Sequence, residues 1–114
     1  MSGISTHVLD TSLGQPAAGV PVLLEIQEAA GNWKQLAEAT TNADGRVPQL
    51  LPAGASLAAA TYRLTFDTTA YFRTRSVEGF YPRVTVEFNI RDAAQHHHVP
   101  LLLSPFGYST YRGS

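Results

Sequence analysis

The side chains of this chain best suited to acid–base chemistry are its four histidines, three of which are consecutive. His7 lies near the start in ISTHVLD, and the others occupy residues 96–98 in QHHHVPLLL. An imidazole gains and loses a proton near neutral pH, because its ordinary pKa is about 6.5. Two histidines that the fold brings together could therefore act as general acid and general base.

An arginine and the C-terminal segment supply further candidate groups. Arg46 follows the turn sequence NADG, and a guanidinium offers a permanent positive charge with a planar fork of donors. The segment SPFGYSTYRGS, residues 104–114, is aromatic and strand-like rather than a polar tail, and it ends on Ser114. A hydroxyl and an ionised α-carboxylate at that position would both accept hydrogen bonds.

Each of these residues has a plainer interpretation when it is taken alone. His7, His96 and His97 would then be surface or packing histidines. Arg46 would be a solvated charge, and the last residue of the chain would be frayed. His96 and His98 are spaced to chelate a metal on one face of a strand, but the chain has no cysteine and only Asp92 as a nearby acid. We therefore expect no metal site and no cofactor.

The elements that must position these groups are mostly strands, because apolar residues recur at every second position. In residues 83–90, RVTVEFNI, four apolar side chains alternate with four polar ones, the pattern of a strand with one buried face. Residues 68–76 lack this alternation and are predicted as one short helix, with Thr68 or Thr69 as its N-cap. The predicted strands cover residues 4–10, 20–27, 33–41, 62–68, 83–90, 96–105 and 107–114. Many short strands separated by turns are typical of a β-sandwich.

The same alternation assigns the candidate side chains to faces of the sheets. Those expected to face the core are Ile4, Thr6 and Val8 of the first strand and His97, Val99, Leu101 and Leu103 of the penultimate one. Those expected to face outward are Ser5, His7 and Leu9, and His96, His98, Pro100 and Leu102. Because the outward set includes Leu9, Pro100 and Leu102, it is more apolar than solvent requires, and we expect another subunit to cover it.

Length and composition exclude several classes of protein. A chain of 114 residues with a hydrophobic fraction of 44% predicts a single globular domain, residues 1–114. A net charge of −1 and scattered basic residues argue against nucleic acid or an anionic membrane as the partner. The chain has no cysteine, its start does not read as a signal peptide, and no apolar run would span a bilayer. We expect a cytoplasmic protein.

Three stretches together resemble the transthyretin-related proteins, the 5-hydroxyisourate hydrolases of urate catabolism. They are STHVLDTSLGQPAAGVPV near the start, NADGRV after the third strand, and HHHVPLLLSPFGYSTYRGS at the end. The resemblance covers essentially the whole chain, and its most specific part is the closing YRGS, which transthyretin itself lacks along with the enzymatic histidines. One departure is His97, where the family usually has tyrosine. Because His97 is expected to face away from His98, the change should affect packing more than chemistry.

The resemblance implies an all-β, transthyretin-like sandwich of two four-stranded antiparallel sheets with one short helix. It also implies a homotetramer, a dimer of dimers, with active sites in a channel where the dimers meet. Carried over position by position, the implied catalytic residues are His7, Arg46, His98 and Ser114, and the implied substrate-binding residues are Tyr111 and Arg112.

The implied reaction is the opening of the ring of 5-hydroxyisourate, a small oxidised purine, by water to give a ureidoimidazoline. Either His98 or His7 would take the proton of the water, and Arg46 would stabilise the oxyanion. Ser114 would orient water or substrate by hydrogen bonding, without a covalent role. Two alternatives stay open: a transthyretin-like carrier of an apolar ligand, which a cationic channel would suit poorly, and an interaction domain without a small ligand.

Overall fold

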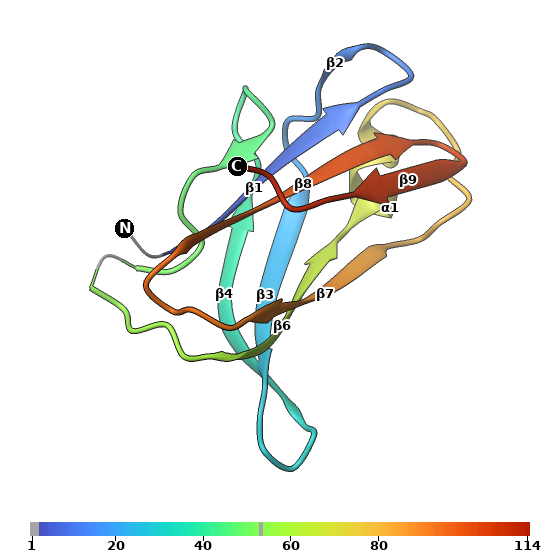
Figure 1. Ribbon diagram of the computed structural model, residues 1–114. Coiled ribbons are helices and arrows are strands. Elements are labelled where there is room, and N and C mark those ends of the chain that lie inside the picture. Colours follow the sequence, from blue (N-terminus) through green and yellow to red (C-terminus); the bar gives the residue numbers. More distant parts are fainter. Residues whose placement is uncertain (1–2, 53) are drawn as a thin grey trace.

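The computed structural model describes residues 3–52 and 54–114, which form nine strands and one helix (Figure 1). The elements are β1 (Gly3–Asp10), β2 (Gln15–Pro16), β3 (Pro21–Gln27), β4 (Trp33–Thr40), β5 (Arg46–Val47), β6 (Ala60–Phe66), α1 (Thr68–Thr74), β7 (Val84–Ile90), β8 (His96–Ser104) and β9 (Gly107–Thr110). The predicted all-β sandwich with one short helix is confirmed.

The strands form two sheets, one of which has the four antiparallel strands predicted, in the order β4-β3-β6-β7. The other differs in two respects. It has the order β2-β1-β8-β9 with β5 as a fifth strand paired to β1, and its central pair, β1 and β8, is parallel. β2 and β5 are only two residues long and come from segments with turn sequences. Such short strands are too brief to show an alternating pattern.

The hydrophobic core lies between the sheets and is built by the predicted faces. Ile4 and Val8 of β1 and Leu101 of β8 have no exposed surface, and Leu64 and Phe66 of β6 are equally buried. His97 is also on this side and is 5% exposed, as the alternation predicts. Successive side chains of a strand point to opposite faces, so His7 of β1 and His98 of β8 lie on the outer face of the same sheet.

The N-cap of the helix is one residue earlier than the first residue that the sequence suggests for it. The N-cap is Asp67, whose carboxylate accepts a hydrogen bond from the Ala70 amide at 3.0 Å, so the prediction of Thr68 or Thr69 is wrong. The two threonine hydroxyls instead donate to the carbonyls of Tyr81 and Pro82, both at 2.8 Å. They fasten the helix to the segment that leads into β7.

The last strand is shorter than predicted, because the chain leaves the ladder after Thr110. β9 pairs with β8 from Gly107 to Thr110, whereas the sequence predicted a strand to residue 114. Tyr111 and Arg112 lie outside the ladder, and Gly113 rejoins β8 in the same antiparallel register, where its amide donates to the carbonyl of His98 at 2.9 Å. Figure 1 shows the C-terminal end beside β1 and β5. The tail therefore returns to the strands that carry His7 and Arg46.

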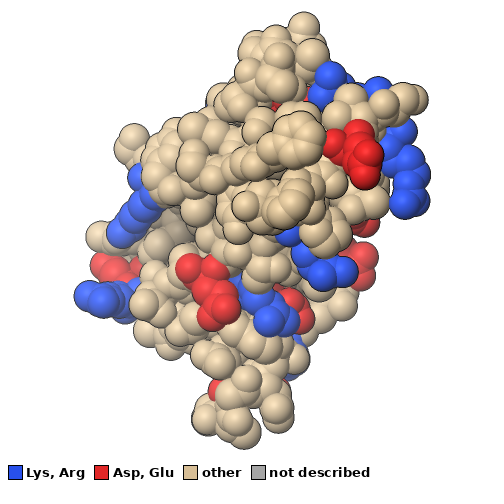
Figure 2. Space-filling model, turned by 90° about the vertical axis from the view of Figure 1, so that its right-hand side faces the viewer, with Lys and Arg blue, Asp and Glu red and all other residues tan. Residues whose placement is uncertain are grey.

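Charged side chains of both signs are interspersed on the face that Figure 2 shows, without a large area of one sign. This distribution agrees with the small net charge of −1, and the face shown has no basic surface of the kind that binds phosphate backbones. In the part of the chain that the structure describes, no helix has the length and apolar character needed to cross a membrane.

Candidate active site

A cavity of about 280 Å³ on the outer side of the β1–β8 pair gathers three of the four predicted catalytic residues. Its lining consists of Ser5, Thr6, Arg46, Pro48, His96, His98 and Ser114. These residues come from β1, β5, β8 and the C-terminal tail, which are far apart in the sequence. The fold therefore brings a guanidinium, two imidazoles and a terminal hydroxyl to one concave surface.

His7 lies at the edge of this cavity, directly across from Arg46 in the ladder between β1 and β5. Residues opposite each other in antiparallel strands point to the same face, so the imidazole and the guanidinium are neighbours. The pKa of His7 is lowered from 6.5, first by burial and then by the charge of Arg46. All four predicted catalytic residues thus lie in one connected region.

The turn before Arg46 is held in place by Asn42 and Gly45. The Asn42 side-chain oxygen accepts from the amides of Asp44 and Arg46, at 2.9 and 3.0 Å. Gly45 has φ of 73°, and a Cβ there would lie 2.4 Å from the carbonyl oxygen of Val8. Only glycine fits this close approach and this backbone conformation. The sequence NADGR therefore fastens Arg46 against β1.

His98 is held by contacts on two edges of its ring. The Nδ1 atom lies 2.7 Å from the Ser5 hydroxyl, and the register places Ser5 directly beside His98. On the other edge, Gly113 packs so closely that a Cβ would lie 2.5 Å from His98 Cδ2. The glycine of the YRGS tail is therefore required by the position of the imidazole, and it carries Ser114 into the cavity.

The neutral form of the His98 imidazole is favoured, since its pKa is lowered from 6.5. Burial is the largest cause, followed by the positive charge of Arg46 and the neighbouring His7 and His96. Each of these disfavours the protonated ring. Because His7 is shifted in the same direction, both histidines are free to accept a proton.

Tyr111 and Arg112 lie away from this cavity in the single chain. Both line a neighbouring hollow between β8 and β7 that also includes His97 and His98. The Arg112 guanidinium donates to the Gln95 side chain at 3.1 Å. The pKa of His97 is lowered by burial and by the charge of Arg112, and its Nδ1 has no hydrogen-bond partner among the described residues. The structure thus brings together the predicted catalytic residues but not the two predicted substrate-binding residues.

Sequence reasoning missed Ser5, the packing of Gly113 on His98, and the contact of 2.7 Å between His96 Nε2 and the Ser5 hydroxyl. Alternation already places Ser5 on the outward face with His7, so a signal for it was present. What the sequence does not contain is the parallel register that sets Ser5 beside His98. Gly113 is part of the YRGS motif, but its close packing on His98 appears only once the pairing of the tail with β8 is known.

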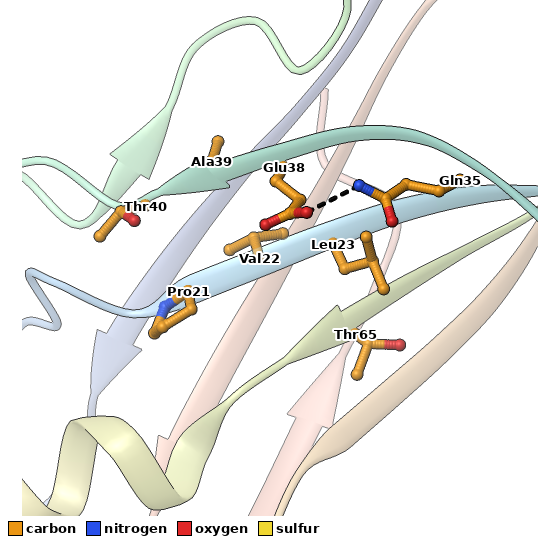
Figure 3. Close-up of a pocket in the computed structure, with 8 residues that line it drawn as sticks. All are labelled: Pro21, Val22, Leu23, Gln35, Glu38, Ala39, Thr40 and Thr65. Carbon is orange, nitrogen blue, oxygen red and sulfur yellow. Dashed lines mark hydrogen bonds between the residues drawn. The ribbon is translucent and has the colours of Figure 1, made fainter.

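A further hollow, at the other sheet, has fewer groups that could do chemistry. It has a volume of about 400 Å³ and lies on the outer face of β3 and β4, where Gln35 donates to Glu38 at 2.7 Å (Figure 3). It contains no histidine, and Glu38 is its one ionisable side chain. Within residues 3–52 and 54–114, no three histidine, aspartate or glutamate side chains come together as metal ligands would.

Comparisons with known proteins place these residues in context. The model of the HIUase/Transthyretin family matches residues 4–113. A protein of Caenorhabditis elegans described as a probable 5-hydroxyisourate hydrolase is 51% identical over 99% of this chain and 82% of its own length. The solved 5-hydroxyisourate hydrolase of Klebsiella pneumoniae is 41% identical, covers 99% of this chain and 100% of that one, and superposes with a TM-score of 0.85. Sea bream transthyretin in complex with thyroxine is 31% identical over 97% of this chain and 94% of that one, with a TM-score of 0.90.

Proposed function

The chain belongs to the HIUase/transthyretin family, and we propose that it hydrolyses 5-hydroxyisourate, opening the ring to a ureidoimidazoline. The observation that carries this proposal is the cavity that joins Arg46, His98 and Ser114, with His7 beside Arg46. The backbone does not decide between enzyme and carrier, because a transthyretin superposes at least as well as a hydrolase. The side chains of the cavity and the higher identity to hydrolases favour the enzyme.

A neutral histidine would activate the water. The water must lose a proton as it attacks the cyclic amide, and a neutral imidazole is the base that accepts it near neutral pH. His98 and His7 both qualify, since the pKa of each is lowered. The nitrogen that leaves must then gain a proton, which either ring could supply from a protonated nitrogen.

Arg46 would stabilise the negative charge that attack creates on the carbonyl oxygen. Its guanidinium is exposed at the mouth of the cavity and can direct two donors at ureide oxygens. One such preorganised donor is worth about 3–4 kcal/mol in other hydrolases. Ser114 would orient the water or the substrate, and it needs no covalent step for this.

Residues 1–114 would act as one domain within a homotetramer built as a dimer of dimers. A single core cluster supports the first point. The homotetramer is supported by large exposed side chains on and around β9, which another subunit would cover. Phe106 is 75% exposed and Tyr108 is 43% exposed. Tyr111 and Arg112 would reach substrate only if a neighbouring subunit completes the site. Light scattering on the purified protein should give the mass of four chains.

The alternative function is a carrier in the same channel, as for the thyroxine complex of the sea bream protein. An apolar ligand would meet Arg46 and two imidazoles there, whereas pockets that bind such ligands are mostly apolar. One assay separates the two functions. 5-Hydroxyisourate is generated freshly from urate, and its ultraviolet absorbance is followed with the protein, with a His98→Asn variant, and with neither.

The proposal predicts fast loss of absorbance with the protein and near-spontaneous loss with the variant. A decay that matches the protein-free rate, while an iodinated aromatic ligand binds tightly, would favour the carrier. Equal acceleration by the protein and the His98→Asn variant would remove His98 from the mechanism.

A further inference from the structure

One serine hydroxyl lies between two imidazoles at the proposed active site. Ser5 Oγ is 2.7 Å from His98 Nδ1 and 2.7 Å from His96 Nε2. Ser5 is 7% exposed, and among the described residues its hydroxyl has no other side-chain hydrogen bond. The Ser5 hydroxyl therefore connects the exposed His96 to the half-buried His98 through two contacts.

The directions of these two hydrogen bonds are coupled, because the Ser5 hydroxyl has one proton to donate. If Ser5 donates to His96 Nε2, it must accept from His98 Nδ1–H, and both neutral rings then carry their proton on Nδ1. If Ser5 donates to His98 Nδ1, it must accept from His96 Nε2–H, and both rings carry their proton on Nε2. A state in which both rings donate would leave the Ser5 proton without an acceptor. As long as Ser5 donates to one ring and accepts from the other, the two rings therefore share one tautomer.

The two shared states differ in what His98 can do. Its Nδ1 is always engaged with Ser5, so Nε2 is the nitrogen available to water or substrate. In the first state Nε2 has a lone pair and His98 is a base, whereas in the second Nε2–H makes it an acid. The bond between Ser5 and His96 thus determines which role His98 can perform.

We propose that Ser5 is a positioning residue of the hydrolysis, which links His96 to His98 and sets the tautomer of His98. This inference rests on the proposed function. When His98 takes a proton from water at Nε2, its Nδ1 proton passes to Ser5 Oγ and the Ser5 proton passes to His96 Nε2. One proton enters and two shift, so His98 is left neutral with Nε2–H, ready to protonate the leaving nitrogen. His96 becomes the imidazolium, and because it is exposed, water solvates its charge.

The test begins with a measurement that needs no substrate. The imidazole nitrogens of the full chain, labelled with nitrogen-15, are recorded by long-range proton–nitrogen spectroscopy at about pH 8, above the ordinary histidine pKa. His96→Gln and His98→Gln variants assign the signals. We expect His96 and His98 to show the same tautomer, and different tautomers would overturn the proposal.

The second measurement is a hydroxyl deletion with its conservative rescue. In Ser5→Ala the two rings lose their link, so we expect the nitrogen shifts of His98 to change and kcat to fall about tenfold or more at nearly constant KM. Ser5→Thr keeps a hydroxyl and should restore both, whereas Ser56→Ala, at an exposed serine outside the site, should change neither. Unchanged shifts and kcat in Ser5→Ala would overturn the proposal. A shared tautomer without any hydrolysis would establish the link between the two rings but overturn the proposed function, and with it the role of Ser5 in the hydrolysis.

Discussion

Arg46 lies directly across from His7 between β5 and β1, and its positive charge lowers the pKa of His7 and of His98. The same guanidinium therefore has two effects. It favours the unprotonated form of the candidate bases, and in the proposed reaction it would offer donors to the oxygen that becomes negative during attack. The two effects can be separated with a lysine at this position. Lysine keeps the positive charge that lowers the histidine pKa values but lacks the planar pair of donors.

Replacing Arg46 tests its contact with the oxyanion. Arg46→Gln should lower kcat by about 10²–10³, the cost of losing one preorganised donor. Arg46→Lys keeps the charge but not the planar fork, so it should fall between this variant and the wild type. Arg83→Lys, at another exposed arginine, is the matched control and should retain full activity. Wild-type turnover in Arg46→Gln, at an unchanged oligomeric mass, would remove Arg46 from the mechanism.

The pH dependence of kcat/KM tests the effect of Arg46 on the bases. A base works when it is deprotonated, so activity should fall as the pH drops through its pKa. Because burial and Arg46 lower the pKa of both His7 and His98, this fall should lie below pH 6.5. In Arg46→Gln the charge is gone while burial remains, so the acid limb should move to higher pH. An acid limb above pH 6.5 in the wild type would contradict the assignment.

The sequence predicted the sheet faces well, because one buried face forces a period of two. This rule placed Ile4 and Leu101 in the core and left His7 and His98 on the outer face. It could not predict that β1 and β8 are parallel neighbours, since alternation contains no information on which strands pair. The role of Ser5 depends on that register and was therefore missed.

The C-terminal tail shows the other limit of sequence reasoning. GYSTYRGS alternates well enough to be predicted as one strand, yet the chain leaves β9 after Thr110. The glycine at 113 allows the tail to lie on His98, where any side chain would collide. A local pattern could not reveal this contact, because its cause is a ring fifteen positions earlier in the sequence.

Gly113 should be replaceable only at a cost to catalysis. A Cβ at this position would lie 2.5 Å from His98 Cδ2 and 3.2 Å from Pro100 Cγ, so either the ring or the tail must move. Gly113→Ala should lower kcat at least about tenfold, since small misplacements of catalytic groups are costly. In Gly107→Ala the new Cβ would meet nothing closer than 3.7 Å, and activity should be retained. Comparable activity in both variants would show that the tail is not fixed against His98.

The buried carboxylate of Asp10 should contribute to stability rather than to the reaction. Burial would raise its pKa, but hydrogen bonds from Ser12 and Tyr71 and the charge of Arg75 outweigh this and lower the pKa. Burial and Asp10 raise the pKa of Tyr71 to about 12, so its hydroxyl stays a donor, at 2.6 Å. Tyr71→Phe should lower the free energy of unfolding by about 1.5–3 kcal/mol in urea, the range for hydrogen bonds to charged groups.

A matched comparison isolates the charge of Asp10. Tyr62 is also buried, but its hydroxyl bonds to neutral groups: it donates to the carbonyl of Ala58 at 2.7 Å and accepts from the Ala58 amide at 3.1 Å. Tyr62→Phe should therefore cost less, about 0.5–1.5 kcal/mol. Both variants should keep the kcat of the wild type. An equal cost for the two substitutions would show that the charge of Asp10 adds nothing to its bond with Tyr71.

Residues added after Ser114 should inhibit the enzyme, because Ser114 lines the cavity together with Arg46 and His98. A short flexible extension with a protease site would put backbone atoms where the substrate and its water must bind, so KM should rise and kcat fall. Cleavage back to Ser114 should restore activity in the same preparation, which makes the extended protein its own control. The oligomeric mass, measured before and after cleavage, distinguishes a blocked cavity from a disrupted assembly. If the extended protein hydrolyses 5-hydroxyisourate at the rate of the cleaved one, the tail ends outside the reacting site, and Ser114 has no part in orienting water.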